Sequence, residues 1–347
     1  RQSVVSMFLI CQPFLLQKRW LVHTRARALP RKDLTCASAT CIGACTCPAV
    51  GSATYTHISC SGSGLSAGTP FVGPPPSYAT HIVLVSAPIV GNNVFQGLTN
   101  VTSINLEHNG IHALTAGVFR GLVKLEALFL RYNSLTTLPS GIFQDLTALD
   151  VLAIHDNPWN ALPSDLLDNT IALSILFLGR NPSGSLAQLS PTFFANSSTL
   201  KVLSLLESQQ SALSPQLFHS TVKLENVGLL DNPLTALPPD LFRYTSQLNS
   251  VDASRCQLTS IPAQIFHHTP KLTVLYVVAI IFLLFFTPHV TKLEAATGSL
   301  QTSYCLASHS RKRGNPVHRS VLHALGDLAV PVVLVVGNLN ISREQMI

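Results

Sequence analysis

The sequence lacks the motifs that mark several common catalytic sites. It contains no phosphate-binding glycine loop, no kinase signature and no HExxH metal pair. Its 13 histidines are scattered along the chain, and the adjacent His267 and His268 have no third metal ligand at a useful spacing. The sequence therefore predicts a protein that is not an enzyme and that has no cofactor and no metal site.

Charge is also scarce. Charged residues make up 11% of the chain, and residues 34–291 hold nine Lys or Arg against twelve Asp or Glu, a balance of −3. The net charge of +6 therefore comes entirely from the two ends of the chain. A surface that binds nucleic acid needs clustered basic residues to neutralise phosphates. The composition argues against a nucleic-acid ligand.

What the sequence has in abundance is a repeat. Eight units begin 24 residues apart, with a single interval of 27, at Leu98, Leu122, Leu146, Thr170, Ser197, Thr221, Thr245 and Thr269. Apolar residues recur within each unit as LxxLxxLxLxxNxLxxL. This period and spacing are typical of leucine-rich repeats, whose stacked turns bury one another's apolar faces. We expect an α/β repeat solenoid: a curved leucine-rich-repeat horseshoe with a parallel β-sheet on its concave face and few regular helices.

Each unit predicts one short strand followed by a buried amide. Leu128 and Leu130 alternate with Phe129 and Arg131, which is the two-residue period of a half-buried strand. An inward amide can supply a donor and an acceptor to the backbone where the chain leaves the strand. Five units place an amide there, at Asn109, Asn133, Asn157, Asn181 and Asn232, while two others have Ser208 and Cys256. Phenylalanines near the end of the units predict an aromatic column on the convex side: Phe119, Phe143, Phe194, Phe218, Phe242 and Phe266.

Five of the eight cysteines crowd into residues 36–60, a density typical of disulfides in an oxidising compartment. Four of them have the spacing Cx3CxCx12C directly before the repeats: Cys41, Cys45, Cys47 and Cys60. This cluster, with the phrase HISCSGSGLSA, resembles the amino-terminal cap of extracellular leucine-rich-repeat proteins. Residues 36–277 together resemble the ectodomains of Toll-like and Slit-type proteins and of variable lymphocyte receptors. A zinc site is the weaker alternative, because the spacing lacks paired CxxC motifs.

The resemblance implies disulfides between Cys41 and Cys47 and between Cys45 and Cys60. It also implies an extracellular location, with which three glycosylation sequons agree, at Asn100, Asn196 and Asn340. The chain then divides into a cap with a first weak repeat (36–97) and the leucine-rich repeats (98–277). Residues 1–35 contain an apolar stretch of signal-peptide length, Val4 to Gln17, but no clear cleavage site, so a signal segment or anchor and a linker stay open.

The carboxyl-terminal end has two interpretations. Residues 272–291 carry no formal charge over 20 residues, close to the length of a transmembrane helix, and the basic Arg311–Arg313 follows on the expected cytoplasmic side. The truly apolar core is only the 13 residues Val274 to Phe286, which equally suits a buried strand or helix. No four-cysteine carboxyl-terminal cap is present, and the basic tail 292–347 has no assignment.

Ligand binding is expected on the concave face, where the strand register places outward side chains. These are Glu107, Phe129, Arg131, Tyr132, His155, Asp156, Phe177, Arg180, Glu207, Asp231, Asp252 and Arg255. The ligand is expected to be a protein or a glycan. The aromatic and arginine content is typical of protein interfaces, so we predict a protein whose contact is centred on Phe129, Tyr132 and Phe177. The resulting prediction is a single-pass receptor on the extracellular face of the plasma membrane. The alternatives are a secreted matrix protein and a partial product of a larger receptor, and the sequence leaves the oligomeric state open.

Overall fold

The computed structural model describes residues 45–46, 57–61, 80–85, 90, 94–181, 189–277, 304–306 and 333–336. The predicted signal segment, Cys36, Cys41, Cys47 and Asn340 lie outside these residues. So do residues 278–291 of the predicted membrane span.

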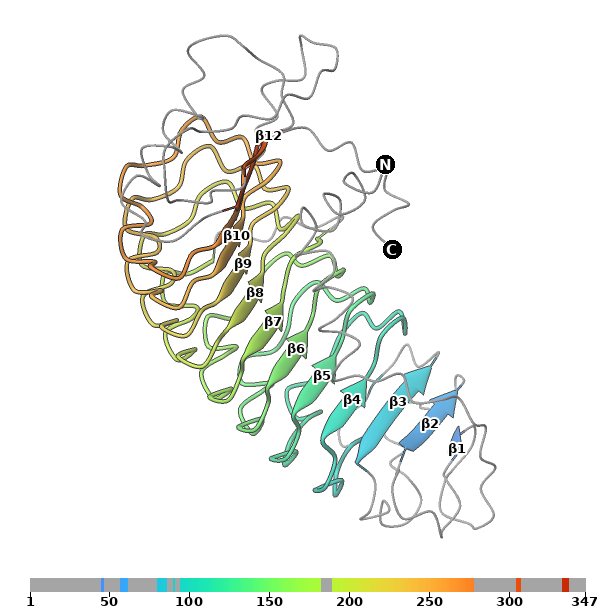
Figure 1. Ribbon diagram of the computed structural model, residues 1–347. Helices are drawn as coiled ribbons and strands as arrows, with labels where there is room; N and C mark the ends of the chain where they lie inside the picture. The colour runs from blue at the N-terminus through green and yellow to red at the C-terminus, as the bar shows by residue number, and fades with distance from the viewer. Residues whose placement is uncertain are drawn as a thin grey trace, which may run out of the picture.

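The fold is one curved sheet in which each turn of the chain adds one strand (Figure 1). Its strands are β1 (Cys45–Thr46), β2 (His57–Ser61), β3 (His81–Val85), β4 (Ser103–Asn105), β5 (Ala127–Phe129), β6 (Val151–Ala153), β7 (Ile175–Phe177), β8 (Val202–Ser204), β9 (Asn226–Gly228), β10 (Ser250–Asp252), β11 (Val274–Tyr276), β12 (Tyr304–Leu306) and β13 (Val333–Val336). From β2 to β11 the strands follow sequence order and pair in parallel. The predicted solenoid with a parallel sheet is confirmed.

The eight sequence units form eight turns, numbered here 1 to 8, and each supplies one of the strands β4 to β11. The register keeps equivalent residues side by side: Leu128 of β5 lies between Ile104 of β4 and Leu152 of β6. All three are fully buried, whereas Ala127 and Phe129 on either side of Leu128 are half-buried. The alternation expected from the sequence is therefore present, with a leucine ladder facing the core.

The described residues contain no α-helix. The returning segments form tight turns instead, closed by backbone bonds three residues apart such as Gln144 N to Gly141 O at 3.0 Å and Leu146 N to Phe143 O at 3.0 Å. Segments built from such tight turns are short enough to lead the chain back to the sheet within a 24-residue repeat. The helical part of the expected α/β class is thus replaced by turns in this part of the chain.

The asparagines form the predicted amide ladder. Asn133 Oδ1 accepts hydrogen bonds from Asn109 N at 3.1 Å and Ile111 N at 3.0 Å in the preceding turn. Its Nδ2 donates to Leu106 O and Leu130 O, both at 2.8 Å. The side chain therefore satisfies buried backbone groups of two turns at once.

A column of buried rings lines the convex side, as predicted. Neighbouring centroids lie 5.7 to 6.2 Å apart, within the range of favourable aromatic pairs. The structure adds Phe95 at the amino-terminal end and shows an interruption at turn 3, where Leu167 takes the position of the ring.

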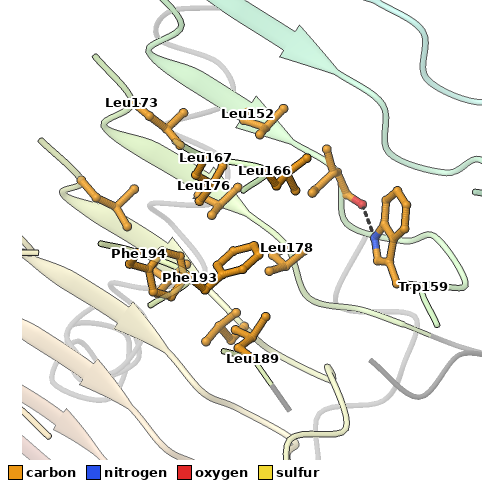
Figure 2. Close-up of a cluster of buried hydrophobic side chains, with 14 of the residues drawn as sticks. Leu152, Trp159, Leu166, Leu167, Leu173, Leu176, Leu178, Leu189, Phe193 and Phe194 are labelled. Atoms are coloured by element: carbon orange, nitrogen blue, oxygen red, sulfur yellow. Dashed lines mark hydrogen bonds between the residues drawn. The ribbon is translucent and has the colours of Figure 1, made fainter. Parts of the chain in front are cut away.

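Turns 3 and 4 depart from the regular repeat. Trp159 replaces the usual leucine after the amide and is fully buried, with its Nε1 donating to Ile154 O at 2.9 Å (Figure 2). Gly179 then lies so close to the next turn that an added Cβ would be 2.0 Å from Leu206 O. Turn 4 is also the 27-residue repeat. The irregular length is thus accompanied by a close backbone approach that only glycine permits.

The two ends of the sheet hold strands outside the repeats. At one end, antiparallel β1 and β2 place Cys45 opposite Cys60. At the other end, β13 pairs in parallel with β11, and β12 pairs with β13. The tail 292–347, which has no assignment from the sequence, therefore contributes two additional strands to the sheet.

The beginning of the predicted membrane span belongs to the last repeat. Leu272, Leu275 and Val277 are buried in the core, and β11 pairs with β10. Within the described residues, no helix has both the length and the apolar character needed to cross a membrane. A membrane span over residues 272–291 stays a prediction.

Candidate ligand-binding face

Side chains that point away from the leucine core form the sheet face, which the horseshoe fold makes the concave side. One row of this face, here called the ledge, follows the strands of turns 1 to 7: His108, Tyr132, Asp156, Arg180, Glu207, Asp231 and Arg255. Each ledge residue has a φ angle between 52° and 58°. Adopting this left-handed conformation costs a non-glycine residue about 1–2 kcal/mol, so most such residues avoid it. Residues held in this conformation are enriched at functional sites.

Aromatic and imidazole rings cross turns 1 to 4 in one continuous row. His108 stacks on Tyr132 with centroids 4.3 Å apart, and Tyr132 meets the edge of His155 at 6.3 Å. His155 in turn lies 5.7 Å from Phe177, and the guanidinium of Arg131 sits 5.5 Å from the Tyr132 ring centroid. Tyr132 is 38% exposed, and His108 is exposed as well. This aromatic row offers a solvent-facing apolar surface to a ligand.

Ion pairs link neighbouring turns along the same face. Arg131 Nε lies 2.6 Å from Glu107 Oε1. Arg180 Nε lies between two carboxylates, 3.9 Å from Asp156 Oδ1 and 3.7 Å from Glu207 Oε1.

A further ion pair joins Arg255 to Asp231. Burial raises the pKa of Asp231, and the positive charge of Arg255 opposes this shift. All three arginines predicted on the face are therefore neutralised by carboxylates of the protein itself.

The predicted site residues gather on this face, with one difference in exposure. Phe129, His155 and Phe177 are half-buried. Asp252 is only 8% exposed, and its Oδ1 accepts a hydrogen bond from Ser254 N at 3.0 Å, so it offers little surface to a ligand. Its neighbour Tyr276, whose pKa is raised by burial and by Asp252, is also nearly buried.

His108, which was not among the predicted site residues, stands at the ledge position of turn 1 and begins the aromatic row. The signal was present, because His108 precedes Asn109 as Tyr132 precedes Asn133. The residue before each ladder amide thus marks a ledge position in the sequence.

Other singled-out residues lie away from the sheet face. Burial raises the pKa of Cys256 to about 12, and its Sγ donates to Leu229 O at 3.3 Å, which makes it an unreactive core residue. Asn196, the last residue of a convex turn, is exposed and donates to Asp168 Oδ1 at 3.2 Å. Asn100 is half-buried and accepts from Lys124 Nζ at 2.7 Å. In the described part of the chain, no three His, Cys, Asp or Glu side chains are grouped to bind a metal.

The fold and the repeats define a leucine-rich-repeat solenoid. Residues 99–159 match the family model "Leucine rich repeat", and residues 181–281 match "BspA type Leucine rich repeat region (6 copies)". No curated protein sequence matches the chain.

Among solved structures, the chain is similar to one of the Toll–Spatzle complex of Drosophila, with 28% identity and a TM-score of 0.54 over 57% of this chain and 26% of that one. It is also similar to the TLR13–ssRNA13 complex, with 23% identity and a TM-score of 0.54 over 57% and 28% of the two chains. A leucine-rich-repeat protein of Leptospira interrogans has 22% identity and a TM-score of 0.50 over 58% and 48%. The chain thus spans about a quarter to a half of the length of these structures.

Proposed function

We propose that this protein recognises a protein ligand on its sheet face, as part of an extracellular receptor held by a membrane span. The observation that carries the proposal is the aromatic row of turns 1 to 4, two of whose four rings, His108 and Tyr132, occupy ledge positions with positive φ. A ledge selected for stability alone would favour glycine or asparagine in this conformation. Exposed rings in rigid positions are the type of residue that anchors protein interfaces.

The charge arrangement favours a protein over a nucleic acid. The ledge and its neighbours carry Arg131, Arg180 and Arg255, and each is already paired with a carboxylate of an adjacent turn. Phosphates would have to break these pairs and approach the carboxylates that remain. Of the two similar complexes, one contains the protein Spatzle and the other ssRNA13, and the paired charges of this face favour a ligand of the first kind.

An extracellular location is supported by the cap and by the sequons. Residues that face each other in an antiparallel pair have Cα atoms about 4.5 to 5.5 Å apart, which is within the range that a disulfide spans. The register of β1 and β2 places Cys45 and Cys60 in this relation. Asn196 is exposed on a convex turn, where a glycan would leave the sheet face open.

We expect peptide mapping without reduction to show Cys45 joined to Cys60, and Cys41 joined to Cys47. Each bond would restrain the unfolded chain by roughly 2–4 kcal/mol and hold the cap against the amino-terminal end of the sheet. Mapping is done on protein secreted from cells, with Cys256 as the internal control for a thiol that stays reduced. Secreted protein in which Cys45 and Cys60 are both alkylated without reduction would contradict the cap and the extracellular location together.

The function is tested by alanine substitutions on the sheet face. Wild-type protein is immobilised and used to isolate binding proteins from extracellular fluid, and the affinity of the purified partner is then measured for each variant. Alanine at Phe129, Tyr132 or Phe177 should weaken binding by about 1–3 kcal/mol, because truncated anchors lose buried apolar contact. The melting temperature should change little, since these side chains lie outside the core.

Two control variants complete the test. Phe143→Ala removes a buried ring of the convex column and should lower the melting temperature while leaving the affinity of the folded protein intact. Asp165→Ala changes the convex side, where the carboxylate accepts from Ser140 Oγ, and should affect neither property strongly. A loss of binding with Asp165→Ala, together with unchanged affinity in the three sheet-face variants, would place the ligand on the convex side.

A further inference from the structure

A hollow of about 280 Å³ lies on the convex side between turns 2 and 3. We call it the convex hollow. Gln144 of turn 2 and Asp165, Asp168 and Asn169 of turn 3 form its polar lining, while Phe143 and Leu166 line its apolar part. The volume is close to the lower end of the range for small-molecule sites, so it suits a ligand of the size of one sugar ring.

The lining of the convex hollow has the chemistry of a carbohydrate site. Carboxylates accept hydrogen bonds from sugar hydroxyls, and the amides of Gln144 and Asn169 can both donate and accept. Gln144, Asp168 and Asn169 are exposed, so a sugar can reach them from solvent. Phe143 and Leu166 are 1% and 2% exposed, so the apolar part is small. A small apolar surface beside amides and carboxylates matches an N-acetylated sugar, which has one methyl group among several polar groups.

Asn196, which lies in a glycosylation sequon, is directly beside the convex hollow. It is the last residue of turn 4, as Asn169 is the last residue of turn 3. Its Nδ2 donates to Asp168 Oδ1 at 3.2 Å, so the nitrogen that would carry a glycan contacts the wall of the hollow. Ser198, the hydroxyl residue of the sequon, is also exposed. A glycosylated amide keeps one hydrogen, so its hydrogen bond to Asp168 can persist.

We propose that the first N-acetylglucosamine of a glycan on Asn196 binds in the convex hollow of the same chain. This inference rests on the proposed extracellular location, because N-glycosylation marks secreted proteins. The first sugar is bonded directly to the asparagine nitrogen, so it begins one covalent bond from an atom in contact with Asp168. Its hydroxyl and amide groups then meet the polar lining, and its methyl group meets the apolar part. The docked sugar joins turns 2, 3 and 4 on the convex side and leaves the sheet face open.

The glycan of this chain fits the convex hollow better than a free sugar does. The lining is largely exposed, so a free monosaccharide would gain few buried contacts there. A tethered sugar has an effective concentration in the millimolar range, so it occupies even a weak site. The sequon at Asn100 offers a comparison within the chain. Its side chain accepts from Lys124 Nζ at 2.7 Å, and Lys124 lies outside the lining of the hollow.

The first experiment measures how fast endoglycosidase H trims the glycans at Asn100 and Asn196. The full chain is secreted from cells that make only high-mannose glycans. The enzyme cleaves the core just beyond the first N-acetylglucosamine, so docking of this sugar should slow it. The double variant Gln144→Ala/Asn169→Ala should speed trimming at Asn196 at least about 5-fold, because the docked sugar loses two amide partners. Both side chains are exposed, so the variant should fold normally.

Trimming at Asn100 should be equally fast in both proteins, which controls for changes in the enzyme's access to the chain. An unchanged rate at Asn196 in the double variant overturns the proposal. Peptide mass spectrometry of the same samples reports which sequons carry a glycan. A glycan at Asn100 with none at Asn196 overturns the docking proposal and leaves the extracellular location standing. Absence of glycan from every sequon contradicts that location as well.

The second experiment compares melting temperatures. Ser198→Ala removes the sequon and leaves Asn196 with its hydrogen bond to Asp168, so it isolates the effect of the glycan. It should lower the melting temperature by about 2–4 °C, the shift expected for one or two net hydrogen bonds in a chain of this size. In the Gln144→Ala/Asn169→Ala background the same change should have little effect, because interacting sites are not additive.

Asn100→Gln is the matched control for the melting experiment. It removes the other glycan of the repeats, so its effect should be the same with and without the two alanines in the convex hollow. A glycan at Asn196 that stabilises both backgrounds equally, or neither, overturns the contact with the hollow.

Discussion

Replacing Asn133 with alanine is expected to lower the free energy of unfolding by about 3–5 kcal/mol. The amide accepts from two backbone N–H groups and donates to two backbone carbonyls at 3.1 Å or less, and the side chain is only 7% exposed. Alanine leaves these groups buried without partners, and each unsatisfied group costs about 1–3 kcal/mol, less where water enters. Urea unfolding of both proteins measures the difference.

Asn181 provides the matched control for this prediction. It has the same place in turn 4 and is 3% exposed, yet among the described residues its Nδ2 donates to Trp159 O alone, at 2.8 Å, and its buried Oδ1 has no hydrogen-bond partner there. Asn181→Ala should therefore cost about 1 kcal/mol. Equal losses in the two variants would show that side-chain volume, and not the hydrogen bonds, makes asparagine necessary in the ladder.

The difference between these two asparagines shows where prediction from the sequence ends. The period and the leucine pattern predict the strands, the amide ladder and the convex column, because each depends on a residue type at a fixed place in the repeat. The number of hydrogen bonds that a ladder asparagine makes depends on the backbone groups of the preceding turn. In the regular ladder one of the donors is the N–H group two residues after the preceding amide, as Ile111 N is for Asn133. In turn 3 the equivalent group, Trp159 N–H, bonds to Asn157 O at 2.9 Å instead, and Asn181 Oδ1 has no partner among the described residues.

The sheet face illustrates the same limit. Alternation along β5 correctly predicts that Leu128 is buried and that Phe129 is more exposed. The pairing of each arginine with a carboxylate of a neighbouring turn is a property of the assembled solenoid, because the partners are 24 to 27 residues apart in the chain. Because of this pairing, the face does not offer separate charges to a ligand. It has neutralised ion pairs beside the aromatic row.

The strands β12 and β13 could not be predicted for a related reason. Their segments, Tyr304–Leu306 and Val333–Val336, lie outside the repeat and have no periodic neighbour that would specify a partner. A short β-branched run fits the edge of any sheet, and here β13 pairs with β11, the last repeat strand. Such a strand covers the sheet edge that is exposed at the end of a solenoid.

Gly179→Ala is expected to destabilise the protein by at least about 3 kcal/mol, at the upper end of the range for overpacked sites. The added Cβ would lie 2.0 Å from Leu206 O and 2.6 Å from Leu206 N, which are backbone atoms of the next turn. Those atoms are held in place, because Arg180 N donates to Leu206 O at 2.5 Å and Gly179 N donates to Ser204 O at 3.2 Å. Turns 4 and 5 would have to separate and break these bonds. Thermal and urea unfolding measure the loss.

Two comparisons separate this clash from other effects of alanine. Gly121→Ala introduces a Cβ that meets no atom within 4 Å, at a φ of 78°, so it reports only the backbone cost of about 1 kcal/mol. Leu206→Ala in the Gly179→Ala background should give no rescue, because the clash involves the backbone of Leu206 and not its side chain. Recovery of stability in that double variant would contradict the close approach. If the clash is correct, Gly179→Ala should also weaken ligand binding in the folded protein, since Arg180 and Glu207 pair across the boundary that it forces open.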